Sequence, residues 1–498
     1  MPPSRDDLPT ALYSAAQVRE LDARLIAAGT PGFELMQRAA HAAWRALRQR
    51  WSEETTVTVL AGRGNNAGDG YLLAALAARA GWTVRVLAVG DPQQLRGDAA
   101  LAHGEALGAG VAVQPWSGEL PDSGVLVDAL LGTGLQGAVR EPYAAAIAAA
   151  NASGLPILAV DIPSGLCADS GAELGVAIRA TLTVSFIGLK FGLFSGQGPD
   201  RVGELRFDAL GGAASLLAEV PLARRLDADT APRLAPRERT AHKGRFGHLL
   251  VLGGERGTGG AALLASEMAL RSGAGLVSLA TRADTLPAAL ARCPEVMSLA
   301  LESANQLPSL LARATHVVVG PGLGQGAWAR SLLSAVAACG KPQVWDADAL
   351  NLLAAGAVQL PTAALLTPHP GEAARLLGID TAALQADRRA AALELARRFD
   401  AVVVLKGAGS LVADPQGRLM LCDRGHPAMA SAGLGDVLAG LLGALRAQGL
   451  AAFEAACLGV WLHARAGERL GAQGRGLAAG DLIAVIREML EEHAPCLN

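Results

Sequence analysis

The sequence predicts two successive α/β domains, each built on a doubly wound, mainly parallel sheet. The chain has 498 residues, which is too long for one ordinary hydrophobic core. Short β-branched runs alternate with segments of helical spacing in both halves, as in parallel sheets whose strands are connected by helices. Half of the residues are apolar, aromatic residues are few, and Ala and Gly are abundant. Small side chains of this kind suit closely packed α/β layers better than an all-β sandwich.

Charge and cysteine content exclude several classes of protein. The net charge is −3 and no long run of Lys or Arg occurs, so nothing supports nucleic-acid binding. No apolar stretch is long enough to cross a bilayer, and the first residues lack the features of a signal peptide. The six cysteines are scattered from Cys167 to Cys496 without a Cys-x-x-Cys pair. We therefore expect reduced thiols in a cytoplasmic protein that binds neither a membrane nor a nucleic acid.

The first half begins with helices and continues with alternating strands and helices. Ser14-Ala-Ala-Gln17 is a capping box, which predicts a helix that ends near Gly29. The pattern then predicts helices over residues 33–49 and 71–80, and strands over residues 56–60, 84–88, 125–127, 157–160, 181–186 and 204–207.

Polar and Gly-rich segments directly follow three of these strands. They are residues 61–70, the segment from Asp128, and Asp161-Ile-Pro-Ser-Gly165. Ligands of open parallel sheets bind at this edge, beyond the carboxyl ends of the strands. The first segment is not the usual dinucleotide fingerprint, because Ala67 stands where the third glycine is required. For Asn65 alone, a loop hydrogen bond that caps a helix is the simpler interpretation.

Three motifs of this half resemble the signatures of NAD(P)H-hydrate epimerases over about residues 12–210. They are Gly64-Asn-Asn-Ala-Gly-Asp-Gly70, Val127-Asp-Ala-Leu-Leu-Gly-Thr-Gly134 and Val160-Asp-Ile-Pro-Ser-Gly165. The resemblance implies a Rossmann-like three-layer domain that binds the hydrated nucleotide. The implied substrate-binding residues are Asn65, Asn66, Ala67, Gly68, Asp69, Gly132, Thr133, Gly134, Leu135, Gln136, Gly137, Ala138 and Asp161. It also implies a potassium ion held by Asn66, Asp128 and Ser164, whose oxygen atoms suit such an ion.

Asp161 is the expected acid or base of the epimerisation, and Lys190 is a second candidate. A purely structural helix cap is the alternative for Asp161. Ala67 replaces the glycine usual in the family, a change that we expect to be tolerated.

The periodicity weakens between residues 211 and 239, where prolines and charges accumulate. This predicts a linker, with domains at residues 1–222 and 223–498. The second half then predicts strands over residues 248–252, 276–280, 316–319, 343–345, 364–366 and 401–405, and helices over residues 261–272, 437–445 and 453–470.

The stretch Gly433-Leu-Gly-Asp436 precedes one of these helices. Glycines at a helix start allow backbone N–H groups to converge on an anion, and the helix dipole adds to their attraction. A carboxylate on the first turn can accept a proton from a hydroxyl that attacks a phosphoryl group. The alternative is an ordinary helix start with a favourable Asp.

The second half resembles the ribokinase-like ADP/ATP-dependent NAD(P)H-hydrate dehydratases over about residues 239–490. The motifs are Asp346-Ala-Asp-Ala-Leu-Asn351, Thr367-Pro-His-Pro-Gly-Glu372 and Gly433-Leu-Gly-Asp-Val-Leu-Ala-Gly440, and no P-loop motif occurs. The resemblance implies hydrate contacts from Ala261, Gly322, Gly324, His369 and Asp436. It implies contacts to the adenine nucleotide from Lys406, Gly407, Ala408, Gly409, Ser410 and Gly435. Leu434 stands where the family usually has Thr or Ser, which removes a hydroxyl near the phosphates.

We expect Asp436 to be the catalytic base and Mg²⁺ to accompany ADP. Glu372 either orients that ion through water or is a surface residue at a helix start, and His369 either contacts the ligand or is a turn histidine. Asp346 and Asp348 have the alternative of ending a strand and capping the next helix, and His463 is interpreted as structural.

The predicted function is therefore repair of hydrated NAD(P)H, namely NAD(P)HX, by a homo-oligomer. One half would interconvert the R and S epimers, and the other would dehydrate the S form while ADP becomes AMP and phosphate. The first alternative is a ribokinase-like kinase for a vitamin precursor. The second is a first half that binds nucleotide without catalysis.

Overall fold

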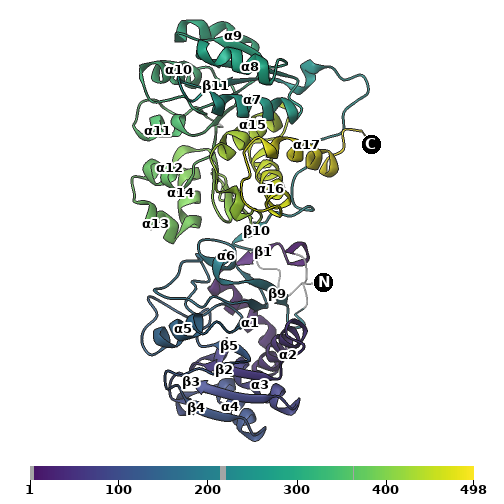
Figure 1. The fold of residues 1–498 in the computed structure, drawn as a ribbon, viewed down its shortest axis with the longest axis vertical. Helices are drawn as coiled ribbons and strands as arrows, with labels where there is room; N and C mark the ends of the chain where they lie inside the picture. Colours follow the sequence, from purple (N-terminus) through teal and green to yellow (C-terminus); the bar gives the residue numbers. More distant parts are fainter. Residues whose placement is uncertain (1–4, 213–219, 363, 498) are drawn as a thin grey trace. The chain divides into compact units, whose positions relative to one another are not determined.

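The computed structural model describes residues 5–212, 220–362 and 364–497. Their contacts divide the chain into two compact units, Met1–Arg224 and Arg225–Asn498. Each unit has its own sheet and its own hydrophobic core (Figure 1).

The first unit contains a parallel sheet with the strand order β4-β3-β2-β5-β6-β7-β9. The strands are β2 (Thr56–Ala61), β3 (Thr83–Ala88), β4 (Ala112–Pro115), β5 (Val125–Ala129), β6 (Ile157–Val160), β7 (Leu182–Phe186) and β9 (Glu204–Asp208). The order runs outward in both directions from the neighbours β2 and β5. This is the topological switch point at which open α/β sheets bind ligands.

Helices cover both faces of this sheet. The helices are α1 (Ala15–Ala27), α2 (Gly32–Arg50), α3 (Asn65–Arg79), α4 (Gly97–Gly108), α5 (Tyr143–Ala152) and α6 (Gly198–Arg201). Helices α2, α3 and α4 share one hydrophobic cluster with the strands, and α5 belongs to a second cluster. Outside this seven-stranded sheet, β1 (Ala11–Tyr13) pairs with β8 (Leu189–Lys190) and with β10 (Ala223–Arg225).

The second unit contains strands in the order β13-β12-β11-β14-β15-β16-β17-β18-β19. The strands are β11 (His248–Leu252), β12 (Leu276–Thr281), β13 (Met297–Ala300), β14 (His316–Val319), β15 (Gln343–Trp345), β16 (Leu365–Leu366), β17 (Val402–Leu405), β18 (Ser410–Ala413) and β19 (Leu419–Cys422). Pairing is parallel from β13 to β17, whereas β17-β18 and β18-β19 are antiparallel. The switch point lies between β11 and β14.

Helices α7, α15, α16 and α17 share one hydrophobic cluster with this sheet. In Figure 1, α7, α15 and α16 lie beside one another in the second unit. The helices are α7 (Gly259–Arg271), α8 (Leu286–Arg292), α9 (Leu307–Arg313), α10 (Ala327–Ala337), α11 (Asp348–Ala354), α12 (Pro370–Leu377), α13 (Thr381–Ala386), α14 (Arg388–Phe399), α15 (Leu434–Ala447), α16 (Ala452–Gly471) and α17 (Asp481–His493).

The predicted fold class is confirmed, and so are most of the predicted strands. The starts of two helices were predicted too late, because α3 begins at Asn65 and α15 begins at Leu434. The edge strands β4 and β13 and the antiparallel strands β18 and β19 were not predicted from the sequence. In the predicted linker, residues 223–225 form a strand, and residues 213–219 lie outside the described part of the chain.

Candidate active sites

A cavity of about 660 Å³ opens at the switch point of the first unit. Its walls include the N-terminus of α3, the segment after β5 and the end of β6. The predicted residues that line it are Asn65, Asn66, Asp69, Gly132, Thr133, Gly134, Leu135, Gln136 and Asp161. Ala67, Gly68, Gly137 and Ala138 are not among its lining residues. Ala67 is fully buried in the core, so the methyl group that replaces the usual glycine hydrogen packs against protein.

Asp161 and Lys190 form an ion pair at the wall of this cavity. Lys190 is fully buried, and its ammonium group donates hydrogen bonds to the Asp161 carboxylate, to Ser185 Oγ at 3.2 Å and to the Phe186 carbonyl at 3.0 Å. The Phe186 N–H also donates to Asp161 Oδ1, at 3.0 Å. No helix of the described chain begins at Asp161, and its φ of 69° is left-handed, so the helix-cap alternative is wrong.

Further carboxylates face the same space. Burial raises the pKa of Asp69 well above its usual range, and the charges of Asp161 and Asp22 raise it further. Burial also raises the pKa of Asp22, which with Asp98 lines the cavity from α1 and α4. Asp22 and Asp98 were not predicted as site residues, because each lies in a helix without a recognisable motif.

The predicted potassium ligands Asn66, Asp128 and Ser164 lie in one cluster, in which Ser164 contacts Asp128 and shares the Leu131 carbonyl with Asn66. Ser164 Oγ donates to Asp128 Oδ1 at 2.6 Å, and the Ser164 N–H donates to Asp128 Oδ2 at 2.8 Å. The Asn66 amide donates to the Leu131 carbonyl at 3.2 Å, and Ser164 Oγ lies 3.1 Å from the same carbonyl oxygen.

Two features of this cluster fit a monovalent cation. Asn66 Oδ1 is buried and accepts no hydrogen bond from the described residues. Burial raises the pKa of Asp128 to about 6, although hydrogen bonds from Ser164 oppose the rise. A cation beside these oxygen atoms would give Asn66 Oδ1 a partner and would stabilise the negative charge of Asp128.

In the second unit, the Gly433–Asp436 turn begins α15. Gly433 precedes the helix with a φ of 88°, so Leu434, Gly435 and Asp436 form its first turn. Leu434 is buried in the hydrophobic core, so its side chain points away from solvent. It does not replace the Thr or Ser hydroxyl group that the family usually has at this position. His463 lies 3.0 Å from the Leu434 carbonyl through Nε2, which agrees with its structural interpretation.

Asp436 is surrounded by other acidic groups. Burial, followed by the charge of Asp346, raises the pKa of Asp436 to about 7, and Lys406 opposes the rise. A carboxylate that titrates near neutral pH is suited to general base catalysis. The structure thus gives Asp436 the property that its proposed role requires.

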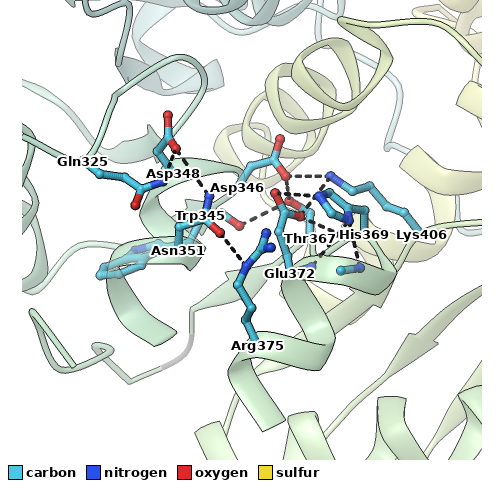
Figure 2. A network of polar contacts seen from close by, with 11 residues as sticks. Gln325, Trp345, Asp346, Asp348, Asn351, Thr367, His369, Glu372, Arg375 and Lys406 are labelled. Carbon is cyan, nitrogen blue, oxygen red and sulfur yellow. Dashed lines mark hydrogen bonds and ion pairs between the residues drawn. The ribbon is translucent and has the colours of Figure 1, made fainter. Parts of the chain in front are cut away.

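Lys406 is the cation that links these acidic groups (Figure 2). Its Nζ lies 2.8 Å from Asp346 Oδ1 and 3.9 Å from Glu372 Oε2, and a Cβ on Gly435 would lie 3.2 Å from it. Asp346 also accepts from Thr367 Oγ1 at 2.8 Å. Burial by itself would lower the pKa of Lys406. The negative charges of Asp346 and Glu372 outweigh this effect, so the pKa of Lys406 is raised. Asp346 thus pairs with Lys406 and does not cap the helix that follows β15.

Asp348 forms a second group of polar contacts, which includes the glycine turn of the predicted hydrate site. Its Oδ2 accepts from the Gly324 N–H at 2.8 Å, and its Oδ1 accepts from Gln325 Nε2 at 3.2 Å and from Asn351 Nδ2 at 3.3 Å. Asn351 in turn accepts from Arg375 (Figure 2). Asp348 therefore fixes the glycine turn at residues 322–324. Ala261 lies in the first turn of α7, the helix that follows β11 in the chain.

His369 and Glu372 form the N-terminal cap of α12. His369 Nδ1 accepts from the Gly371 N–H at 3.0 Å, and Glu372 Oε2 accepts from the His369 N–H at 2.8 Å. Burial lowers the pKa of His369, and Lys406 lowers it further. Glu372 is 5% exposed, so the surface alternative for this residue is wrong. Burial raises its pKa against the opposing charge of Lys406.

The predicted nucleotide loop, Lys406 to Ser410, connects β17 to β18. The Lys406 N–H donates to the Pro368 carbonyl at 2.9 Å, which ties the loop to the segment of His369. Ser410 Oγ donates to the Gly407 carbonyl at 2.9 Å. Within residues 5–212, 220–362 and 364–497, no group of three His, Cys, Asp or Glu side chains forms a metal site, and no helix is long and apolar enough to span a membrane.

Comparisons with known proteins cover both units. Residues 32–192 match the family described as YjeF-related protein N-terminus, and residues 249–488 match the family described as NAD(P)H-hydrate dehydratase. A bifunctional NAD(P)H-hydrate repair enzyme Nnr from Coxiella burnetii is 44% identical over 97% of this chain and 99% of its own length. The Escherichia coli protein of that name is 43% identical over 92% of this chain and 89% of its own length.

Among solved structures, a ribokinase-like superfamily protein from Enterococcus faecalis has a TM-score of 0.52 and 27% identity. The similarity covers 56% of this chain and 98% of that chain. Together with the near full-length relatives, it assigns a ribokinase-like fold to the second unit. The chain belongs to the family of bifunctional NAD(P)H-hydrate repair enzymes, with an epimerase domain followed by a dehydratase domain.

Proposed function

We propose that the second unit dehydrates the S epimer of NAD(P)HX at the expense of ADP, with Asp436 as the base. The observation that carries the proposal is the position of Asp436 on the first turn of α15, where its pKa rises to about 7. The same turn begins with Gly433, and Gly435 approaches Lys406. A helix N-terminus with a nearby ammonium group suits the terminal phosphate of a nucleotide.

In this proposal Asp436 accepts the proton of the ring hydroxyl. The hydroxyl oxygen attacks the terminal phosphorus of ADP, and the bond to the bridging oxygen breaks to release AMP. In the resulting phosphate ester, phosphate then leaves with the electrons of its bond to the ring carbon, and the adjacent ring carbon loses a proton to water. The products are inorganic phosphate and reduced nicotinamide. Phosphate is a better leaving group than hydroxide, which is the chemical reason to spend the nucleotide.

Mg²⁺ bound with ADP would neutralise phosphate charge in this site. Asp346 and Glu372 are buried carboxylates beside Lys406, and either can orient water molecules around such an ion. Their oxygen atoms are ligands of the type that Mg²⁺ prefers. The contacts of Ala261, Gly322, Gly324 and His369 with the hydrate, and of the loop from Lys406 to Ser410 with the nucleotide, belong to the same proposal.

We further propose that the first unit interconverts the epimers and that the Asp161–Lys190 pair accepts and donates the proton in this reaction. Asp161 lies in the cavity wall, and buried Lys190 supplies the opposite charge. Potassium at Asn66, Asp128 and Ser164 would hold together the start of α3, the end of β5 and the segment after β6. Fusion of the two domains has a clear benefit, because a dehydratase specific for one epimer would leave the other unrepaired.

An absorbance assay tests both domains. A mixture of the two NADH-hydrate epimers is incubated with enzyme, Mg²⁺, K⁺ and ADP, and the reduced-nicotinamide band is followed. Complete recovery with release of AMP and phosphate supports the proposal. Recovery that stops near the S fraction contradicts catalysis by the first unit, and a stable phosphorylated product contradicts the dehydratase mechanism in favour of a kinase.

A further inference from the structure

Arg388 is a buried cation behind the loop that we assign to the nucleotide. It is the first residue of α14 and is 2% exposed. Within the described residues it forms hydrogen bonds but no ion pair with a carboxylate. Burial accordingly lowers the pKa of Arg388 to about 10. A buried charge without a counter-ion is costly, so the structure must use it or compensate for it elsewhere.

The guanidinium group is directed at the backbone of this loop. Nη2 lies 3.2 Å from the Lys406 carbonyl, 3.4 Å from the Gly409 carbonyl and 3.5 Å from the Leu405 carbonyl. Nη1 donates to Gln385 Oε1 at 2.9 Å. Two protons on Nη2 serve three carbonyl groups, so these bonds are shared and long. Nε is buried and has no partner in the described chain.

The loop is shaped around this group. Gly407 has a φ of 136°, and a Cβ placed on it would lie 3.0 Å from both Nη1 and Nη2. Any larger residue at this position would therefore press against the guanidinium as well as adopt a strained backbone. Gly407 and Ala408 are exposed, whereas Gly409 is buried. One side of the loop is thus occupied by Arg388, and the other is open to a ligand.

We propose that Arg388 is a positioning residue for the nucleotide. Its guanidinium holds the carbonyl groups of Leu405, Lys406 and Gly409 inward and thereby fixes the loop in the conformation that receives ADP. The positive charge that no protein carboxylate neutralises then attracts the nucleotide phosphates from behind the loop. This inference rests on the proposed assignment of residues 406–410 to the nucleotide.

A purely structural role makes a different prediction from nucleotide positioning. Loss of a structural arginine lowers the melting temperature and leaves the affinity of the folded enzyme for ADP unchanged. Loss of a positioning arginine also weakens ADP binding, because the ordering of the loop must then be supplied on binding. In the described part of the chain, Arg388 forms no hydrogen bond with the glycine turn at residues 322–324, so the proposed hydrate contacts there serve as an internal reference.

The variants are Arg388→Lys and Arg388→Gln, with Arg397→Gln as the matched control. Arg397 lies in the same helix, and its exposed side chain pairs with Glu394. We expect the KM for ADP to rise by about tenfold in Arg388→Gln, with a smaller rise in Arg388→Lys, which keeps the charge but not the fork of donors. The KM for the hydrate and kcat at saturating ADP should change by less than about twofold.

The change in melting temperature on addition of Mg²⁺ and ADP provides a readout that does not depend on turnover. The wild type and Arg397→Gln should be stabilised fully, and the Arg388 variants less. No stabilisation of the wild type would contradict the nucleotide assignment of the loop. If Mg²⁺ and ADP stabilise both the wild type and Arg388→Lys fully, the positioning role of Arg388 is overturned, whereas the assignment of the loop to the nucleotide stands. Arg388→Lys keeps the charge and length of the side chain, so this comparison remains available even where Arg388→Gln does not fold.

Discussion

Lys406 Nζ lies 2.8 Å from Asp346 Oδ1, and this ion pair joins the end of β17 to the end of β15 beside the first turn of α15. Burial is the largest cause of the raised pKa of Asp436; within the pair, Asp346 raises this pKa further and Lys406 lowers it. One ammonium group thus moderates the repulsion among Asp346, Glu372 and Asp436.

Replacement of Lys406 should move the pH profile of the dehydratase. In Lys406→Met, the Asp436 carboxylate keeps its acidic neighbours and loses the opposing cation, so its pKa should rise. A base works in its ionised form, so the acidic limb of kcat, expected near pH 7, should move upward by about one pH unit. The measurement is kcat from pH 5.5 to 9 at saturating ADP. Arg397→Gln is the control, and an unmoved acidic limb would show that Asp436 is not the titrating base.

Replacement of Asp436 itself should separate the two activities. Asp436→Asn keeps the shape of the side chain but removes the proton acceptor, so we expect the dehydratase kcat to fall by about 10²–10⁴. Epimerisation, measured by the exchange of R and S forms, should be unchanged because its cavity lies in the other unit. Retention of more than a tenth of the dehydratase rate would rule out Asp436 as the general base.

The same variant should be more stable than the wild type at alkaline pH. The pKa of Asp436 is about 7 in the folded protein against 3.8 for the free group. Its neutral form therefore stabilises the fold fully below pH 3.8, and this contribution is lost as the pH rises through 7. Asn resembles the neutral form at every pH. We expect Asp436→Asn to raise the melting temperature of the second unit at pH 8 and much less at pH 5, by about 2–4 °C per kcal/mol gained. An equal gain at both pH values would contradict the raised pKa.

The strand ends of the two sheets were predictable, because parallel strands that are buried on both faces consist of continuous apolar residues in the sequence. Residues 157–160, 248–252 and 316–319 are strands with the predicted bounds. The edge strands were missed, since β4 and β13 are partly exposed and lack a continuous apolar run. The late predicted start of α15 has another cause. Two glycines in four residues suggest a loop, although Leu434 packs into the core and the helix begins at this residue, directly after Gly433.

The site was predictable where residues belong to a local motif. Partners that come from distant elements were not, because long-range contacts leave no local pattern. Asp346 and Lys406 are 60 residues apart, and neither position by itself identifies the other as its partner. Arg388 is a stronger example, because in the sequence it is one of two adjacent arginines at a helix start, and only the fold buries it behind the loop.

The Asp161–Lys190 pair should carry the epimerase activity. Asp161→Asn removes the carboxylate and leaves the Phe186 N–H and the Lys190 ammonium with a neutral oxygen, so we expect the epimerisation rate to fall by about 10²–10⁴. Lys190→Met buries an apolar side chain of similar length and should also abolish epimerisation. Dehydration of the pure S epimer, measured in both variants, should match the wild type. Wild-type epimerisation in Asp161→Asn would refute the assignment of that residue.

Potassium should stabilise the first unit in a manner that depends on the ionisation of Asp128. The pKa of Asp128 is about 6 when no cation lies beside it. The ionised form attracts K⁺ and the neutral form does not, so the stabilisation should be full above pH 7 and should decline as the pH falls through 6. The measurement is the melting temperature of the first unit in KCl against choline chloride of equal ionic strength, from pH 5 to 8.

Asn66→Ala provides the matched test of this potassium site. It removes the buried Oδ1 that has no partner in the described chain, together with the amide that binds the Leu131 carbonyl. Its melting temperature should respond equally to KCl and choline chloride at every pH, whereas Asn65→Ala, next to it at the start of α3, should keep the wild-type response. A response of the wild type that does not vary with pH would mean that Asp128 is not a ligand, because a carboxylate ligand must lose its proton before the cation binds.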